Sequence, residues 1–377
     1  MLGNLISFYE QKRLFLEHRH EVENNLLIEE PLWILVGSKV VETNKDKLDE
    51  GITSDILKFI RFLNQLKLEK EKYSEYIKNI FEDKTQLKNK GSNQSFFIDK
   101  FPYVRQLLRD EFNNNFQMLL ADIFRLVLYT DYNNAELVLE NIKSSDGEIG
   151  LKYNDSTKYF GLIYVGKGND AKIINSDFIK KMNIPTRDQV IKTSLFETLN
   201  RKEKDPLNIL VGAKKFIEGW DNYRISSMLL MNFAKSKGVS AIQLFGRGVR
   251  LHGTQNSMKR SSFTNPHIER SELRKNLELL ETLNVFGINA SYMEEFRNEL
   301  MEDIDFYIER EILVEKDPKH IIKHDLKCIK KEVNTEESFR TSKIVVLSTF
   351  PSVSIDIDNH LSVLKSKKIE EQVIKPT

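Results

Sequence analysis

A glutamine and two arginines just before residue 251 are spaced as on one face of a helix. Gln243, Arg247 and Arg250 stand at positions i, i+4 and i+7, so a helix would place them on one face. A guanidinium is planar, permanently charged and able to hold phosphate oxygens through two N–H groups. It also stabilises the charge that develops during phosphoryl transfer. The spacing therefore predicts a helix that presents phosphate-binding groups on one side.

The other side of this helix should be buried. Ile242, Phe245 and Val249 fall opposite the arginines. Gly246 and Gly248 each cost roughly 1 kcal/mol relative to Ala inside a helix, which favours a site where another group approaches the backbone closely. A surface helix with simply solvated arginines is the alternative for this stretch on its own.

A second polar cluster comes earlier in the chain, after the apolar run 207–211. Glu218, Gly219 and Asp221 lie in the turn that follows this run, which reads as a buried strand. Ligands of parallel α/β sheets bind at the carboxyl ends of strands, although an ordinary strand-to-helix turn is the alternative. The two clusters occur in order, 24 residues apart from Gly219 to Gln243, with a strand between them. That combination is hard to obtain by chance.

Charge supports a phosphate-binding surface in the same region. The 377-residue chain has a formal net charge of +1, but residues 201–260 hold twelve Lys or Arg against four Asp or Glu, an excess of eight positive charges. A compact basic stretch in a near-neutral chain is typical of a surface that binds phosphates.

The elements that must position these residues alternate between strands and helices. Residues 1–28 show the spacing of an amphipathic helix, and the apolar run 31–37 reads as a strand buried on both faces. A helix is expected from Thr53, followed by a polar helical stretch over 65–125. Further strands are expected at 135–142, 147–153, 159–165, 207–211 and 227–231. This order predicts an α/β fold with a parallel sheet flanked by helices.

The clusters resemble motifs of superfamily-two helicases. Glu218-Gly-Trp-Asp221 is similar to motif V, Gln243-x-x-Gly-Arg247-x-x-Arg250 to motif VI, and residues 31–39 to the strand that bears motif IV. The wider text KKFIEGWDNYR, IQLFGRGVRL and Met258-Lys-Arg-Ser resembles the restriction-type DEAD/DEAH helicases, including the type III restriction subunit. So do residues 146–151 and 280–287. The resemblance covers most of residues 30–300 and implies the second RecA-like lobe of such a motor.

The resemblance also implies roles for individual residues. Arg247 and Arg250 would reach the γ-phosphate of an ATP held by another lobe, with Gln243 and Gly246 beside them. Glu218, Gly219 and Asp221 would line the nucleotide. Lysines on such a surface are more often merely solvated, but five cations are candidates for contacts with DNA phosphates: Lys39, Lys214, Lys215, Lys259 and Arg260.

Two departures from the family pattern stand out. Ala213 occupies the place where motif V often has Thr or Ser, so a hydroxyl contact to DNA is lost or moved to a backbone amide. About 175 residues separate the strand at 31–37 from the strand at 207–211, which indicates an insertion at about 65–175. The expected domains are a connector helix at 1–28, the lobe at 29–265 and an α+β extension at 266–377.

A phosphate-cradling loop is absent from the sequence. An ATPase of this class needs G-x-x-x-x-G-K-[ST] and an acidic pair for magnesium. Residues 165–168 have the wrong glycine spacing, and Asp110-Glu111 lies in a polar helical stretch with no strand before it. ATP and Mg²⁺ are therefore expected only together with a first RecA-like lobe. The chain is expected to be the C-terminal piece of a longer protein, or else that lobe is a separate polypeptide.

Other chemistries have weaker signals. The single cysteine, Cys328, excludes an internal disulfide and fits a reducing cytoplasm. The spacing of Asp317 and residues 325–327 resembles the acidic motif of a restriction nuclease only loosely. His320 and His324 could share a metal ion, but no third ligand accompanies them. No apolar run is long enough to span a membrane.

The expected function is therefore that of the arginine-supplying lobe of an ATP-dependent DNA helicase or translocase in a type III-like restriction system. Expected partners are double-stranded DNA, the missing lobe, and a methyltransferase or specificity subunit. The alternatives are a non-catalytic nucleic-acid-binding or partner-binding module derived from such a lobe, and a fragment of a DNA repair or phage helicase.

Overall fold

The structure of the chain is a computed structural model, and the residues it describes belong to one compact unit within residues 1–293. The described residues are 1–37, 55–89, 93–131, 135–166, 168–191, 193–199, 205–212, 222–231, 245–264, 266–268 and 271–288.

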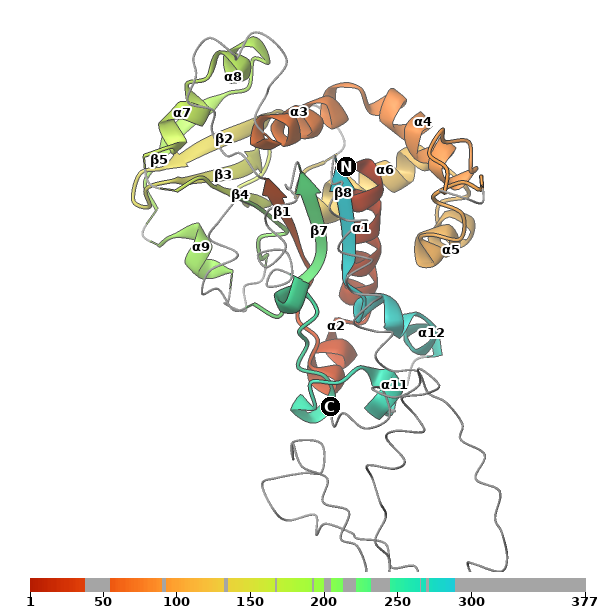
Figure 1. Cartoon of the computed structure of the whole chain (residues 1–377). Helices are drawn as coiled ribbons and strands as arrows, with labels where there is room; N and C mark the ends of the chain where they lie inside the picture. The colour runs from red at the N-terminus through yellow and green to blue at the C-terminus, as the bar shows by residue number, and fades with distance from the viewer. Residues whose placement is uncertain are drawn as a thin grey trace, which may run out of the picture. The chain divides into compact units, whose positions relative to one another are not determined.

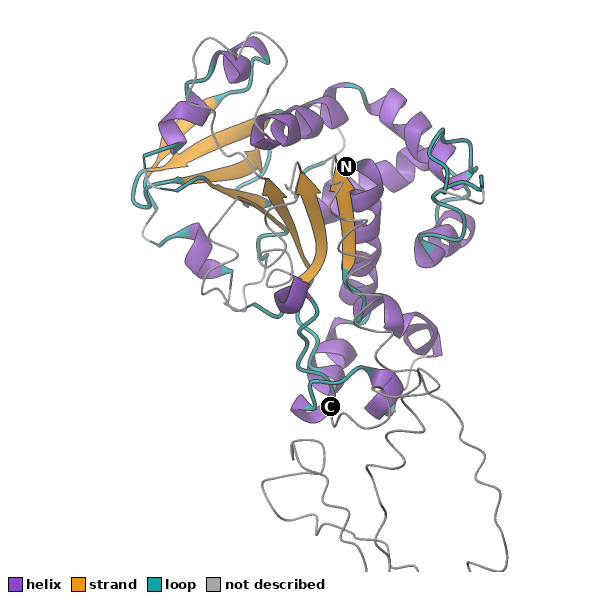
Figure 2. Cartoon of the chain, viewed as in Figure 1, coloured by secondary structure: helices purple, strands orange, loops and turns teal. Residues whose placement is uncertain are grey.

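One sheet organises this unit (Figures 1 and 2). Within the described residues it has eight strands in the order β5-β2-β3-β4-β6-β1-β7-β8. The central run β4-β6-β1-β7-β8 is parallel throughout, which confirms the expected α/β fold and is consistent with a RecA-like sheet. The strands are β1 (Leu32–Gly37), β2 (Leu137–Ile142), β3 (Glu148–Tyr153), β4 (Gly161–Tyr164), β5 (Thr186–Gln189), β6 (Ile209–Gly212), β7 (Ile225–Met231) and β8 (Asn284–Ile288).

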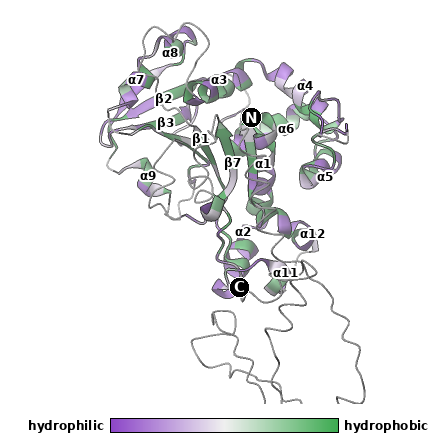
Figure 3. Cartoon of the chain, in the orientation of Figure 1, coloured by the Kyte–Doolittle hydropathy of each residue, from purple (hydrophilic) through white to green (hydrophobic). Residues whose placement is uncertain are grey.

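The three central strands β6, β1 and β7 are largely apolar, with Ser226 and Ser227 of β7 as buried exceptions, because both faces of the sheet are covered there. All residues of β6 and β7 are buried, as are the first five of β1, and the hydrophobic colouring of β1 is visible in Figure 3. A continuous apolar run is the pattern that a parallel strand needs. The strands expected at 31–37, 207–211 and 227–231 are confirmed.

The segment expected as an insertion, 65–175, shares this sheet. Its strands β2 and β3 pair antiparallel, and β3 pairs antiparallel with β4, which then lies parallel to β6. The remainder of the segment is largely helical, as the sequence predicts. The described helices are α1 (Leu2–Glu17), α2 (Arg19–Glu21), a π-helical turn η1 (Val22–Leu26), α3 (Asp55–Leu68), α4 (Lys70–Phe81), α5 (Pro102–Asp110), α6 (Phe116–Val127), α7 (Asp170–Ile174), α8 (Asp177–Lys181), α9 (Leu195–Thr198), the 3₁₀ turn η4 (Thr254–Asn256), α11 (Ser261–Thr264) and α12 (Ser271–Leu280).

Helix α1 is buried on nearly every side, so the expected amphipathic pattern with one exposed face is wrong. It packs against β7, β8, α5, α6 and α12 (Figure 1). Its polar side chains are buried with partners that are distant in sequence. Asn4 Nδ2 donates to Ser227 Oγ at 2.6 Å, and Gln11 Nε2 donates to the carbonyls of Leu279 and Thr282 at 2.6 and 2.7 Å.

Glu10 of α1 caps the amino end of α5. Its Oε1 accepts hydrogen bonds from the backbone N–H groups of Tyr103 at 2.8 Å and Val104 at 3.2 Å, two of the N–H groups that a helix leaves without internal partners. Glu10 is only 4 % exposed. Burial raises the pKa of this carboxyl to about 7, although the two N–H donors and Arg105 act in the opposite direction.

Stability should therefore fall as the pH rises from 4.5 to 7. In this range folded Glu10 holds a proton that the unfolded chain has released, so the folded state binds more protons and loses stability with rising pH. The difference between pKa values of about 7 and 4.5 corresponds to about 3 kcal/mol. A Glu10→Gln variant keeps an acceptor oxygen and should lose this part of the pH dependence, as measured by urea unfolding across the range.

Glu111→Gln is the matched control. Glu111 directly follows α5 and is exposed, with an ion pair to Arg13, so its removal should leave the fall in stability between pH 4.5 and 7 in place. Equal pH slopes for wild type and Glu10→Gln would refute the assignment of this titration to Glu10.

Candidate functional site

Within the described part of the arginine-bearing segment, residues 245–248 are helical. Phe245 is 8 % exposed, so its expected burial is confirmed. Two other expectations are wrong. Val249 is 57 % exposed, and Arg250 lies beyond the last helical residue, because the helix ends before either position and its periodicity no longer applies.

The two glycines of this turn have different surroundings. A Cβ atom at Gly248 would overlap Met228 Cε of β7 and come within 2.9 Å of Leu283 Cδ2. A Cβ atom at Gly246 would meet nothing within 4 Å, and Gly246 is exposed. The sequence predicts that another group lies close to the backbone at these glycines. In the structure this happens at Gly248, where the group belongs to the protein's own core.

Alanine at these two positions should have opposite effects on stability. Gly248→Ala should destabilise the chain by about 1 to 3 kcal/mol, since the added methyl group overpacks the contact with Met228. Gly246→Ala, the matched control, should be neutral or stabilise by up to about 1 kcal/mol through helix propensity. Urea unfolding of both variants measures this difference. Equal effects at the two positions would contradict the described packing.

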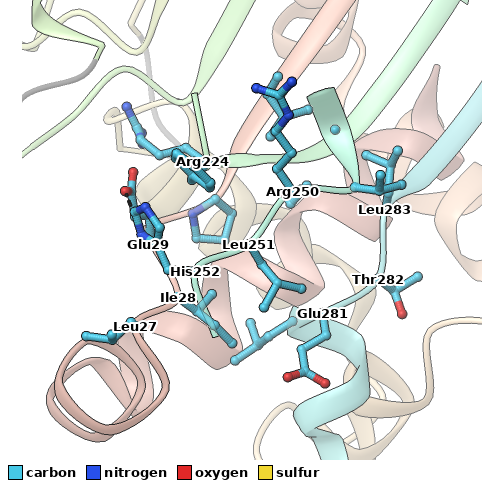
Figure 4. A pocket seen from close by; sticks show the side chains of 17 residues that line it. Leu27, Ile28, Glu29, Arg224, Arg250, Leu251, His252, Glu281, Thr282 and Leu283 are labelled. Atoms are coloured by element: carbon cyan, nitrogen blue, oxygen red, sulfur yellow. Dashed lines mark ion pairs between the residues drawn. The ribbon is translucent and has the colours of Figure 1, made fainter. Parts of the chain in front are cut away.

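Arg247 and Arg250 lie at the end of this turn. Arg247 is half-buried and Arg250 is exposed, and Arg250 N donates to Arg247 O at 3.4 Å. In Figure 4 the Arg250 side chain extends away from Leu251 and Glu281. The buried Phe245 thus anchors a turn that carries two guanidinium groups at or near the surface.

A small pocket adjoins Arg250 at the amino ends of the parallel strands (Figure 4). Pro31, Ile225 and Leu283 line it, and these residues stand at or directly before the first residues of β1, β7 and β8. Its volume is about 30 Å³, roughly the share of one water molecule in the liquid. The pocket is therefore much smaller than a typical small-molecule site of roughly 300 to 1,000 Å³.

His252 ties the chain after Arg250 to the turn before β1. Its ring stacks on Tyr223 with a centroid distance of 3.9 Å and an interplanar angle of 29°. Its Nδ1 lies 3.6 Å from Glu29 Oε1, and its carbonyl accepts from Met258 N at 2.8 Å. These contacts fix the backbone two residues beyond Arg250.

Beside the pocket, Arg224 holds three segments together from inside the protein. Its guanidinium is 5 % exposed and donates to three backbone carbonyls. The acceptors are Glu30 O at 2.9 Å, Leu199 O at 3.1 Å and Leu207 O at 2.8 Å. The segment before β1, the end of α9 and the segment before β6 therefore meet on one side chain.

A buried ion pair continues this network into α1. Lys12 Nζ contacts Glu30 Oε1 and donates to Asn208 Oδ1 at 2.7 Å, while Arg19 donates to Glu30 Oε2 at 2.6 Å. Burial lowers the pKa of Lys12 to about 8, against the opposing effect of Glu30. The sequence did not predict these residues as part of a site. Their only signal is polar residues directly before apolar strands, such as Glu30 before 31–37 and Asn208 within 207–211.

Several expected site residues lie outside the described residues. They are the glutamine expected beside the two arginines, the motif V-like residues after β6, the alanine that departs from motif V, and three of the five candidate DNA-binding cations. These residues are Gln243, Glu218, Gly219, Asp221, Ala213, Lys39, Lys214 and Lys215. The weak nuclease-like and histidine signals at 317–327, and Cys328, also lie outside the described residues.

The other two candidate DNA-binding cations are exposed. Lys259 and Arg260 directly precede α11. Among the described residues no ion pair involves either of them.

Two loops that could imitate parts of an ATPase site have other roles. After β4, Gly168 N donates to the carboxylate of Asp146 at 2.9 Å, so this amide already has an anionic partner. Glu111 forms its ion pair with Arg13 at 2.7 Å. Among the described residues, no cluster of three or more His, Cys, Asp or Glu could hold a metal ion, and no helix is long and apolar enough to cross a membrane.

Comparison with known proteins found no match to this chain among protein-family models, curated proteins or solved structures.

Proposed function

We propose that this chain is the second RecA-like lobe of an ATP-dependent DNA helicase or translocase, of the kind found in type III-like restriction systems. In this role Arg247 and Arg250 supply positive charge to an ATP bound mainly by a first lobe. Mg²⁺ and ATP bind only when that lobe is present. The motor acts on double-stranded DNA in the cytoplasm, with a methyltransferase or specificity subunit as a further partner.

One observation carries the proposal. The two arginines lie at the end of a turn in which Phe245 is buried and Gly248 lies against Met228 of a central parallel strand, β7, while Arg250 itself is exposed. A guanidinium that is exposed at the end of an anchored turn is suited to reach a phosphate on another body.

The order of the strands adds support. The strand with the motif IV-like sequence, β1, lies between β6 and β7. The motif V-like sequence follows β6 and the motif VI-like sequence follows β7. Both motif-like sequences therefore follow parallel strands that flank β1 in one sheet.

The test is DNA-stimulated ATP hydrolysis by the chain alone and by the chain together with a first RecA-like lobe, sought in the coding sequence upstream of or near Met1. Turnover is expected only when both lobes are present. If the chain alone hydrolyses ATP and the Arg250→Ala variant does not, the claim that the chain needs a first lobe is wrong. If the chain does not hydrolyse ATP even with a complete first lobe, the assignment as a motor is wrong.

A further inference from the structure

A surface with exposed apolar side chains, and with two cations that form no ion pair among the described residues, follows the arginine segment. Phe263 is 78 % exposed and Met258 is 54 % exposed, and between them stand the exposed cations Lys259 and Arg260. We refer to these four residues as the Phe263 surface. Residues 245–264 contain no Asp or Glu, so nothing within this segment neutralises the two cations.

The backbone beneath the Phe263 surface is held firmly. Ser261 N and Ser261 Oγ each donate to the Glu281 carboxylate at 2.8 Å, which ties the first residue of α11 to the end of α12. Phe263 N donates to Arg260 O at 3.0 Å. The exposure of Phe263 is therefore a property of an anchored turn (α11 and α12 in Figure 1).

The loop before this surface has an unusual backbone conformation. Gln255, Asn256 and Met258 have φ angles of 57°, 55° and 57°, a left-handed region that residues other than glycine rarely adopt. Met258 N closes the loop on His252 O at 2.8 Å. Strained backbone of this kind costs free energy and is concentrated at functional sites.

The combination of an exposed ring with neighbouring cations selects one class of ligand. A nucleic-acid strand offers phosphates for the cations and flat base faces for the ring. In a duplex the base faces are stacked and hidden, and only an unpaired strand presents both at once. An apolar peptide would leave the charges of Lys259 and Arg260 unused.

We propose that the Phe263 surface binds single-stranded nucleic acid, with Phe263 stacked on a base and Lys259 and Arg260 against the adjoining phosphates. This deepens the proposed function, since it names the strand form that the lobe holds. It makes no use of Arg247, Arg250 or ATP.

The test measures binding of the full 377-residue chain to three fluorescent probes by anisotropy: a 20-nucleotide oligo-dT strand, an abasic strand of equal length and charge, and a 20-base-pair duplex. Phe263→Ala should weaken binding to the oligo-dT strand by roughly 5- to 150-fold, the range measured for base stacking on aromatic side chains. It should leave binding to the abasic strand unchanged. The wild-type chain should bind oligo-dT more tightly than either other probe.

The two cations should show a different signature. The double variant Lys259→Ala/Arg260→Ala should weaken binding to both single strands and lower the slope of log K against log salt by roughly 1.4. Tyr76→Ala is the matched control. Tyr76 is 43 % exposed on α4 with Lys72 beside its ring at 5.9 Å, and its loss should change nothing.

Three results would overturn the proposal. They are an unchanged oligo-dT affinity in Phe263→Ala, equal losses for oligo-dT and the abasic strand in that variant, and displacement of oligo-dT by polyglutamate but not by unlabelled strand. The outcome is separable from the proposed function. Binding without ATP turnover in the two-lobe assay would sustain this surface and reject the motor, and turnover without strand binding would do the reverse.

Discussion

Arg250→Ala should reduce the ATP turnover of the motor, assembled from this chain and a first RecA-like lobe, by roughly 10³- to 10⁵-fold. This is the range for removing an arginine that stabilises charge on a transferred phosphoryl group. Because Arg250 is exposed and its head lies outside the core, its removal should leave the stability of the chain nearly unchanged. Steady-state turnover and urea unfolding of the same variant measure the two quantities.

Two further variants make the Arg250 experiment decisive. Arg250→Lys keeps the charge but loses the planar group that binds phosphate with two N–H donors, so most of the turnover should still be lost. Arg109→Ala removes an exposed arginine from α5 and should have no effect. If Arg250→Ala and Arg109→Ala turn over ATP equally fast, Arg250 is not the arginine that completes the site.

Arg224→Met should destabilise the chain by about 3 to 5 kcal/mol. Arg224 is buried and satisfies three carbonyls, those of Glu30, Leu199 and Leu207. Methionine fills part of the volume but donates no hydrogen bond, so three buried acceptors lose their partner, and buried polar groups without partners are costly. Urea unfolding measures the loss through the transition midpoint.

Arg125→Met is the control for Arg224→Met. Arg125 lies on α6, is 59 % exposed and pairs with Asp122, an arrangement that contributes at most about 1 kcal/mol. If Arg224→Met lowers the free energy of unfolding by no more than this, the three carbonyls must form hydrogen bonds with water when the guanidinium is absent. The network before β1 would then be dispensable for the fold.

The sequence predicts the strands better than their partners. The apolar runs that became β1, β6 and β7 were evident because a strand buried on both faces must be apolar throughout. The placement of β4 beside β6 could not be read from the runs, since strand order depends on contacts between distant segments. Whether a segment forms a strand depends largely on its own residues, but the place of that strand in the sheet depends on the rest of the chain.

Helix α1 shows why burial was mispredicted. Lys12, Glu10 and Asn4 look like solvent-exposed positions of a surface helix when their neighbours in sequence are considered alone. Their partners lie far away: Asn208 follows Lys12 by 196 residues, and Ser227 follows Asn4 by 223. A buried polar residue is tolerated only when a partner is present, and no periodicity in the helix itself reveals that partner.

The candidate site was predicted in part. The burial of Phe245 and the close approach at one of the two glycines followed from the spacing, and the structure assigns that approach to Gly248. The expected single helix face failed at Val249 and Arg250, because helical spacing applies only as far as the helix extends. Arg224 was overlooked because its role depends on three carbonyls that the chain brings together only when folded.

The position of β1 has a consequence for how the chain is made. β1 ends at Gly37, yet its two neighbours in the sheet, β6 and β7, end at Gly212 and Met231. At roughly 5 to 20 residues per second, a ribosome needs roughly 10 to 40 s to supply both. Until then a strand with two apolar faces and two open edges has no native partner, so the nascent chain must be protected from aggregation for that interval.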